Sequence, residues 1–231
     1  MHSHKDFLTL LLRNSALPWY ELSDVPASEI VRAYCPKGAN NIEQSCTNLV
    51  SPGSGDALMV NVETTFDPEY GWMFDGLTQS VSTGEMSLDD TMTTFIRFSN
   101  GNQDEFNVLF GNNMDTINSG YCLDLFHSGS KRFISGRCGG KGTSVERIVV
   151  SEVVAINADY LYIYGEDAYE MSNSDVYASR YDSLIIGAGI VDGIISNYSS
   201  VYVQTFMVHN NSVARLTLDQ MQQFCAKISR L

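Results

Sequence analysis

The feature that most constrains the fold of this chain is a candidate β-hairpin at Tyr121–Cys138, which carries a cysteine in each arm. With Ser128-Gly129-Ser130 as the loop, Cys122 lies directly opposite Cys138. Opposed residues at a non-hydrogen-bonded site are close enough for a disulfide, whose Cα separation is about 4.4–6.8 Å. The hairpin therefore predicts antiparallel β structure and favours an oxidising compartment.

The cysteine count is compatible with two disulfides and one free thiol. The five cysteines are Cys35, Cys46, Cys122, Cys138 and Cys225. A Cys35–Cys46 bridge and a Cys122–Cys138 bridge together predict a secreted, cell-surface or virion protein. The alternative is a cytoplasmic protein with five reduced thiols. Neither a CxxC motif nor a Cys/His cluster is present, so we expect no metal site.

Alternating apolar residues predict several more strands. A strand begins at Leu58, and Tyr160–Tyr164 and Val201–Val208 form two others. Residues 91–98 and 103–110 predict a second hairpin around Asn100-Gly101, because Asn-Gly supplies the positive φ angles of a type I′ turn. These arms and the cysteine hairpin would run as a four-stranded meander. Residues 145–156 fit a helix or a buried strand, and we favour the helix.

Helices are expected at both ends of the chain. The N-terminal candidates are residues 7–12 and a segment that starts at Ser23 or Asp24 and ends before Pro36. Near the C-terminus, Thr217-x-x-Gln220 forms a capping box. The buried stripe of that last helix follows at helical spacing and consists of Met221, Phe224, Cys225 and Ile228.

These elements predict an α+β fold: a predominantly antiparallel β meander with N-terminal helices and a C-terminal helix packed on the sheet. With 231 residues, 44% of them hydrophobic, the chain can build one substantial core. We therefore expect a single domain over residues 1–231, in which residues 1–56 form a helical and loop region and residues 57–231 a β-rich body.

The charge distribution suggests how the protein meets its partners. A net charge of −13 argues against binding to a nucleic-acid backbone, and no stretch is apolar enough for a transmembrane helix. Basic residues are concentrated in one stretch, which consists of Lys131, Arg132, Arg137, Lys141 and Arg147. Carboxylates gather between Asp67 and Asp90, where a solvated acidic face is more common than a calcium site. The basic stretch is thus a candidate contact for a protein partner, an acidic ligand or the acidic region of another copy in a homo-oligomer.

Three functions remain open. The sequence favours a non-enzymatic structural or binding protein that acts through partner binding or self-assembly. One alternative is a cysteine-dependent hydrolase or transferase using Cys122 or Cys225 with His127 or His209. The other is an acidic intracellular inhibitor or immunity-type protein.

No cofactor is expected. The sequence Gly187-Ala188-Gly189-Ile190-Val191-Asp192 places Asp where a dinucleotide-binding loop has its last glycine. The Cys-hairpin-Cys element resembles the disulfide-closed hairpins of bacterial adhesin and toxin binding subunits. That likeness covers only the hairpin and implies no functional residue.

Overall fold

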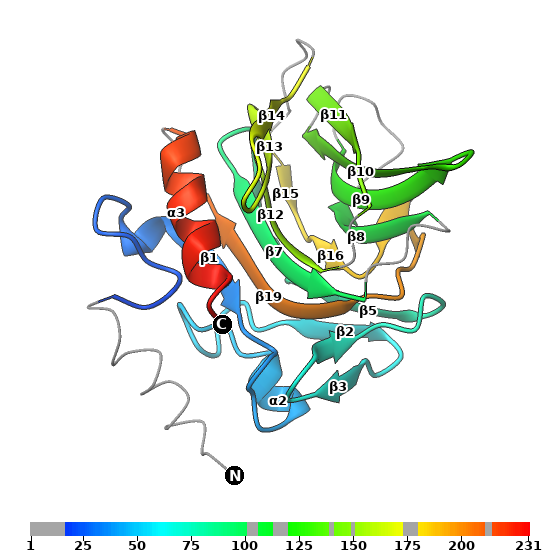
Figure 1. Cartoon of the computed structure of the whole chain (residues 1–231). Helices are drawn as coiled ribbons and strands as arrows, with labels where there is room; N and C mark the ends of the chain where they lie inside the picture. The colour runs from blue at the N-terminus through cyan, green and yellow to red at the C-terminus, as the bar shows by residue number, and fades with distance from the viewer. Residues whose placement is uncertain are drawn as a thin grey trace.

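The computed structural model describes residues 17–100, 106–112, 120–138, 141–148, 151–172, 180–210 and 214–231. In this part of the chain, most of the regular structure is antiparallel β-strand, gathered into two large sheets that lie face to face (Figure 1). The chain is therefore a β-sandwich with a helix on one side. The prediction of a predominantly antiparallel β protein is confirmed, whereas an α+β class with N-terminal helices is not.

The first sheet is the larger and contains both the first strand of the described chain, β1, and the last, β19. Its eight strands, in spatial order, are β14 (Ala168–Glu170), β13 (Tyr160–Ile163), β12 (Glu152–Ile156), β7 (Thr93–Ser99), β19 (Tyr202–His209), β4 (Gly71–Met73) and β3 (Thr65–Asp67), with β1 (Ile30–Tyr34) also paired to β19. Strand β19 lies at the centre of this sheet, beside β7, β4 and β1. The expected strands at 160–164 and 201–208 are confirmed as β13 and β19.

The second sheet contains the cysteine hairpin. Its seven strands, in order, are β11 (Lys141–Glu146), β10 (Lys131–Cys138), β9 (Tyr121–Ser128), β8 (Asn107–Asn112), β16 (Ile185–Ile186), β5 (Gln79–Ser82) and β2 (Leu58–Asn61). Two small pairs complete the strands: β6 (Met86–Leu88) with β15 (Arg180–Asp182), and β17 (Gly189–Val191) with β18 (Ile194–Ser196). The short helices are η1 (Ala27–Glu29) and α2 (Ile42–Ser45), and the longer one is α3 (Leu218–Ile228).

The main core lies between the two sheets. The rings of Phe110 on β8 and Phe206 on β19 meet edge to face at 5.4 Å, and the Tyr121 hydroxyl donates to the Ile156 carbonyl at 2.9 Å. All four residues are buried. Because side chains alternate along a strand, the intervening residues of β9 and β10 point to the opposite, outer face of the second sheet.

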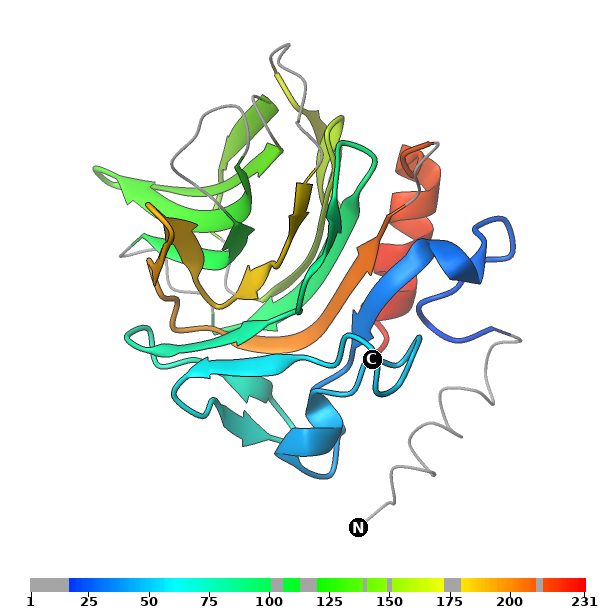
Figure 2. The ribbon, with the colours of Figure 1, turned by 180° about the vertical axis from the view of Figure 1, so that it is seen from behind.

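Helix α3 covers the outer face of the first sheet (Figure 2). Phe224 packs on Phe95 of β7 with ring centroids 5.3 Å apart. The predicted capping box is confirmed, since Thr217 accepts from the Gln220 amide and the Gln220 side chain accepts from the Thr217 amide. The predicted stripe from Met221 to Ile228 is likewise buried, so the C-terminal helix packs on the sheet as expected.

The second expected helix is wrong, and the first lies outside the described residues. Residues 30–34 form β1, preceded only by the single 3₁₀ turn of η1. Ile30 pairs with His209 and Tyr34 with Phe206 on β19. The helical spacing of apolar residues was outweighed by pairing with a strand far along the chain, which suits β-branched Ile30 and Val31.

The hairpin predicted around Asn100-Gly101 is also wrong. Asn100 does adopt a positive φ of 56°, but β7 belongs to the first sheet and β8 to the second. Both strands are buried along nearly their whole length, so each can pair with distant partners. Of the four strands predicted to form a meander, only β8, β9 and β10 are consecutive neighbours in one sheet, and β11, which was not predicted, extends them.

The helix favoured at 145–156 is wrong as well. Residues 141–146 form β11, and residues 152–156 form β12. The dense β-branched residues of this segment match the strand alternative. Further upstream, the strand expected from Leu58 splits into β2 and β3, which lie in different sheets. β2 ends at Asn61, a residue with a φ of 64°.

The cysteine hairpin is confirmed, but its predicted register is wrong by one residue. The turn contains only Gly129 and Ser130, so Cys122 faces Arg137 and Cys138 faces Tyr121. A one-residue slip moves a side chain to the other face of the sheet. All five cysteines are free thiols, and neither predicted disulfide, Cys122–Cys138 or Cys35–Cys46, is formed.

Candidate functional site

An open pocket of about 640 Å³ lies where three connections meet beside the start of α3. The connections are the β6–β7 loop, the β12–β13 turn and the segment before α3. The lining residues are Asp90, Thr91, Asp159, Tyr160, Ala214, Arg215, Leu216, Thr217 and Leu218. We call this the Arg215 pocket. Its volume falls in the range of about 300–1,000 Å³ that is usual for small-ligand sites.

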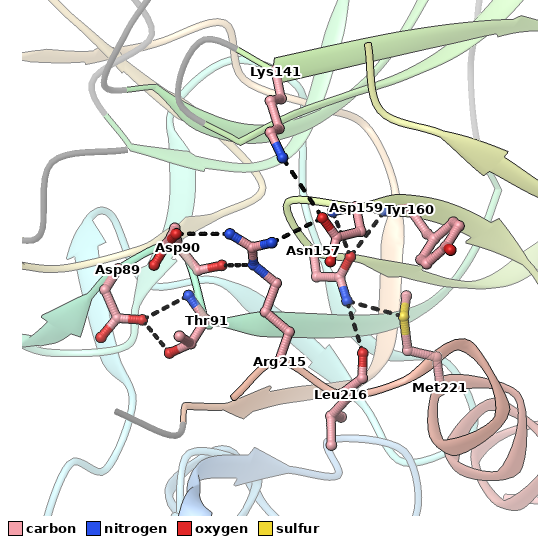
Figure 3. A network of polar contacts seen from close by, with 10 residues as sticks. All are labelled: Asp89, Asp90, Thr91, Lys141, Asn157, Asp159, Tyr160, Arg215, Leu216 and Met221. Carbon is pink, nitrogen blue, oxygen red and sulfur yellow. Dashed lines mark hydrogen bonds and ion pairs between the residues drawn. The ribbon is translucent and has the colours of Figure 1, made fainter. Parts of the chain in front are cut away.

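Arg215 links two walls of the pocket (Figure 3). Its Nη2 atom lies 2.6 Å from Oδ2 of Asp90, and its Nη1 atom lies 2.8 Å from Oδ1 of Asp159. Its Nε atom also donates to the Asp90 carbonyl. Burial opposes the charge of Arg215, but the contacts with Asp159 and Asp90 outweigh it and raise the pKa of the guanidinium. Lys141 of β11 approaches Asp159 at 3.6 Å from the second sheet.

The turns that carry the two carboxylates are themselves held by side-chain hydrogen bonds. Oδ1 of Asn157 accepts from the backbone N–H groups of Asp159 and Tyr160, each at 2.9 Å, and Nδ2 donates to the Leu216 carbonyl at 3.2 Å. On the other wall, Asp89 accepts from the Thr91 amide at 2.9 Å. These bonds fix the pocket before any ligand arrives.

The pocket retains unused polar atoms. In the described part of the chain, Oδ1 of Asp90, Oδ2 of Asp159 and the Tyr160 hydroxyl have no hydrogen-bond partner. Both carboxylates are 40% exposed. Tyr160 also lines the pocket and is half-buried, but its side chain extends away from Arg215 (Figure 3) and packs against the hydrophobic cluster that contains Met221 and Phe224. The site therefore offers fixed acceptors and, from Tyr160, a hydroxyl at its edge. None of its lining residues is a Cys or a His.

The predicted basic stretch is spread over several ion pairs. Lys131 meets Glu146 at 2.6 Å on the surface, and Arg147 meets Glu152 at 3.0 Å and also Glu166. Among its members, Lys141 alone contacts the network of the Arg215 pocket. Arg132 and Arg137 have partners as well, so these cations are not a bare positive surface. Whether they bind a partner remains a prediction.

The outer face of the second sheet carries a row of aromatic rings, which we call the phenylalanine row. Phe126 and Phe133 are cross-strand partners whose rings stack at 5.0 Å, and Phe106 approaches Phe126 at 6.5 Å. Phe106 is 44% exposed. On the same face, Asp124 is buried, and burial raises its pKa to about 7 despite opposing effects of Arg137 and Cys122.

The proposed thiol–imidazole pairs are not assembled. Burial raises the pKa of both the Cys122 and the Cys225 thiols, which keeps them in the unreactive thiol form. His127 is exposed at the tip of the hairpin. His209 is buried with its Nε2 atom 3.1 Å from Glu29, and burial lowers its pKa. Among the described residues, no group of three His, Cys, Asp or Glu side chains is placed to hold a metal ion.

Sequence reasoning missed most of the pocket. The sequence places Asp90 in the acidic region and Lys141 in the basic stretch, but no sequence pattern marks Asp159, Tyr160 and Arg215 as site residues. Arg215 is 125 positions from Asp90 and 56 from Asp159. Only the fold brings these residues together, and no local motif marks them.

No family model and no curated protein matches this chain. Among solved structures, it is similar to domain 4 of AbnA, a GH43 extracellular arabinanase from Geobacillus stearothermophilus in complex with arabinotriose. That likeness has 11% identity and a TM-score of 0.56, and it covers 85% of this chain and 98% of that one.

Two sialidase structures are also similar to this chain. For the Trypanosoma rangeli sialidase, the identity is 11% and the TM-score 0.55, with 89% of this chain and 33% of that chain covered, so this chain spans about a third of that enzyme. For the CBM40 domain of the Ruminococcus gnavus IT-sialidase, the identity is 14% and the TM-score 0.43, with 59% and 83% covered. At these identities the likeness shows the β-sandwich fold alone.

Proposed function

We propose that this chain is a non-catalytic carbohydrate-binding domain and that its ligand occupies the Arg215 pocket. The observation that carries the proposal is the arrangement of Asp90, Arg215 and Asp159 around an open pocket that Tyr160 also lines. Sugar hydroxyls donate to fixed carboxylate oxygens, and the apolar C–H face of a sugar ring packs against an aromatic side chain. Such a site binds by preorganisation, because its polar groups are already in place.

The fold supports a binding role. The similar arabinanase domain is a separate module of nearly the same extent, and its structure contains arabinotriose. Helix α3 and the other described helices are not long and apolar enough to cross a membrane. A glycan ligand would place the protein outside the cell, on a cell surface or on a virion, and this location is part of the same proposal.

A second candidate function uses the phenylalanine row. Exposed aromatic surface is typical of protein interfaces, and Phe106 is 44% exposed beside the hairpin that carries Lys131. This face would bind a protein partner, an acidic ligand or another copy of the chain through the basic stretch. Reversing Lys131, Arg132 and Arg137 to Glu should then abolish association in analytical ultracentrifugation, and unchanged association would exclude this face.

A glycan microarray tests the first proposal, with bound saccharides then measured by isothermal titration calorimetry. We expect Tyr160→Ala and Asp159→Asn each to weaken binding at least about tenfold, the effect of losing about 1.4 kcal/mol. Phe133→Ala, on the other candidate face, is the matched control and should bind as the wild type does. Equal binding by all variants would refute the pocket assignment. Hydrolysis of the bound saccharide would instead make Asp90 and Asp159 candidate catalytic carboxylates.

A further inference from the structure

Two half-buried cations on the first sheet have no carboxylate within ion-pair distance in the part of the chain that the structure describes. Arg97 lies on β7, and Lys37 follows the end of β1. Within the described residues, neither forms an ion pair; the Lys37 ammonium group has no hydrogen bond, and Arg97 makes one, from Nη1 to the Ile228 carbonyl at 3.2 Å. Other partly buried cations of this acidic chain, such as Arg147 and Arg215, meet two carboxylates each.

These cations lie at one end of a row of side chains on the outer face of the first sheet. Arg97 is the direct cross-strand partner of Thr205 on β19. The pairing of Tyr34 with Phe206 places Cys35, the next residue along the chain, beside Thr205. Phe95 and Met207 on the same face pack with α3. The row formed by Cys35, Lys37, Arg97 and Thr205 therefore lies just past the C-terminal end of the helix, where Arg97 donates to the Ile228 carbonyl.

The row contains an unsatisfied donor. Thr205 is 1% exposed, and its hydroxyl faces the Cys35 sulfur without forming a hydrogen bond of standard geometry. A buried hydroxyl that meets only a sulfur, which is a weak acceptor, is poorly satisfied. The Lys37 ammonium and the remaining N–H groups of Arg97 add further donors at the same place, and among the described residues no carboxylate lies within ion-pair distance of them.

The pKa shifts of Lys37 and Arg97 agree with the shortage of acidic partners around these two cations. Burial and then the nearby Arg97 charge lower the pKa of Lys37, and Glu69 compensates only in part. Burial also lowers the pKa of Arg97. Each cation is therefore held at a cost that an anion between them would relieve.

We infer that Lys37, Arg97 and Thr205 form a binding site for a single oxyanion: a sulfate, phosphate or carboxylate group. The planar guanidinium matches two oxygens of such a group, and an ammonium adds a compact charge. The site is separate from the Arg215 pocket and does not depend on the carbohydrate proposal. An oxyanion carried by an acidic saccharide and a free inorganic anion share this chemistry.

Titration of the ¹⁵N-labelled protein with sodium sulfate, at ionic strength held constant with sodium chloride, tests the inference. We expect saturable shifts of the Arg97 Nε and Thr205 amide signals, together with a rise of the melting temperature in sulfate. Lys37→Gln and Arg97→Gln should each weaken sulfate binding at least about tenfold. Lys227→Gln, which removes a partly buried cation bonded to the Pro18 and Glu21 carbonyls, is the matched control and should leave sulfate binding unchanged.

The variants keep the result interpretable. Arg97→Gln also loses the bond to Ile228 and can reduce stability, whereas Lys37→Gln removes no described contact of its ammonium group. Glucuronate, with uncharged glucose as its control, is titrated in the same way. Binding of glucuronate in competition with sulfate assigns the site to an acidic saccharide. Linear shifts without saturation, or equal losses of sulfate binding in Lys37→Gln and Lys227→Gln, would overturn the inference.

Discussion

The Arg215 guanidinium reaches Oδ1 of Asp159 at 2.8 Å and so joins the segment before α3 to the turn between β12 and β13. The same side chain reaches Asp90 of the β6–β7 loop at 2.6 Å. Arg215 therefore stabilises the position of the segment before α3 and also lines the pocket.

Arg215→Gln should lower the free energy of unfolding by about 1–3 kcal/mol, because it removes charged hydrogen bonds from a side chain that is 25% exposed. Lys131→Gln breaks an ion pair whose two side chains are 59% and 52% exposed, and should cost less than about 1 kcal/mol. Urea unfolding of both variants measures the difference. Equal losses of unfolding free energy in the two variants would show that the Arg215 contacts do not stabilise the segment before α3.

Phe224→Ala should cost about 3–5 kcal/mol, because it removes a fully buried ring that packs on Phe95 at 5.3 Å. His127→Ala changes an exposed residue at the tip of the hairpin and should stay within about 0.5 kcal/mol of the wild type. Thermal unfolding compares the two variants. A small loss for Phe224→Ala would mean that α3 contributes little to the core.

Gly71 and Gly165 have nearly the same backbone conformation, with φ of 87° and 86°, but different surroundings. A Cβ atom on Gly71 would lie 2.2 Å from the Val203 carbonyl oxygen, whereas one on Gly165 would meet nothing within 4 Å. Gly165→Ala should cost about 1–2 kcal/mol through its left-handed φ alone. Gly71→Ala should cost clearly more, as measured by chemical denaturation. Similar costs would contradict the close approach of β4 to β19.

Asp124→Asn should change how stability depends on pH. Burial raises the folded-state pKa of Asp124 to about 7, above the unfolded value of about 3.9. The folded protein then binds more protons between these values, so this group's contribution is fully present below about pH 4 and is lost as pH rises towards 7. The slope reaches at most about 1.4 kcal/mol per pH unit.

The test is the difference in unfolding free energy between Asp124→Asn and wild type, measured at pH 5 and at pH 8. The variant should gain relative to the wild type at pH 8. His209 contributes with the opposite sign, because burial lowers its pKa, but it is present in both proteins and cancels. A difference that is independent of pH would mean that Asp124 titrates normally.

The sequence correctly predicts those elements whose stabilising contacts join residues that are close together in the chain. The Thr217–Gln220 capping box spans one helical turn and correctly predicts α3. The hairpin arms of β9 and β10 are also adjacent in sequence, and only the length of the turn was misjudged. That single error removed the predicted contact between Cys122 and Cys138.

The remaining errors concern pairing between distant segments. β1 is a strand because β19 lies beside it, and β7 and β8 join different sheets although an Asn-Gly turn signal follows β7. The Arg215 pocket has the same origin, because its residues come from three connections far apart in sequence. Local periodicity carries no information about such encounters.

The most direct test of the carbohydrate proposal is chemical-shift mapping of the ¹⁵N-labelled protein during titration with arabinotriose and with the strongest saccharide from a glycan array. We expect saturable shifts centred on Thr91, Asp159, Tyr160 and Arg215, which are lost in Tyr160→Ala. Shifts centred on Phe126 and Phe133, or no saturable shift with any saccharide, would contradict it.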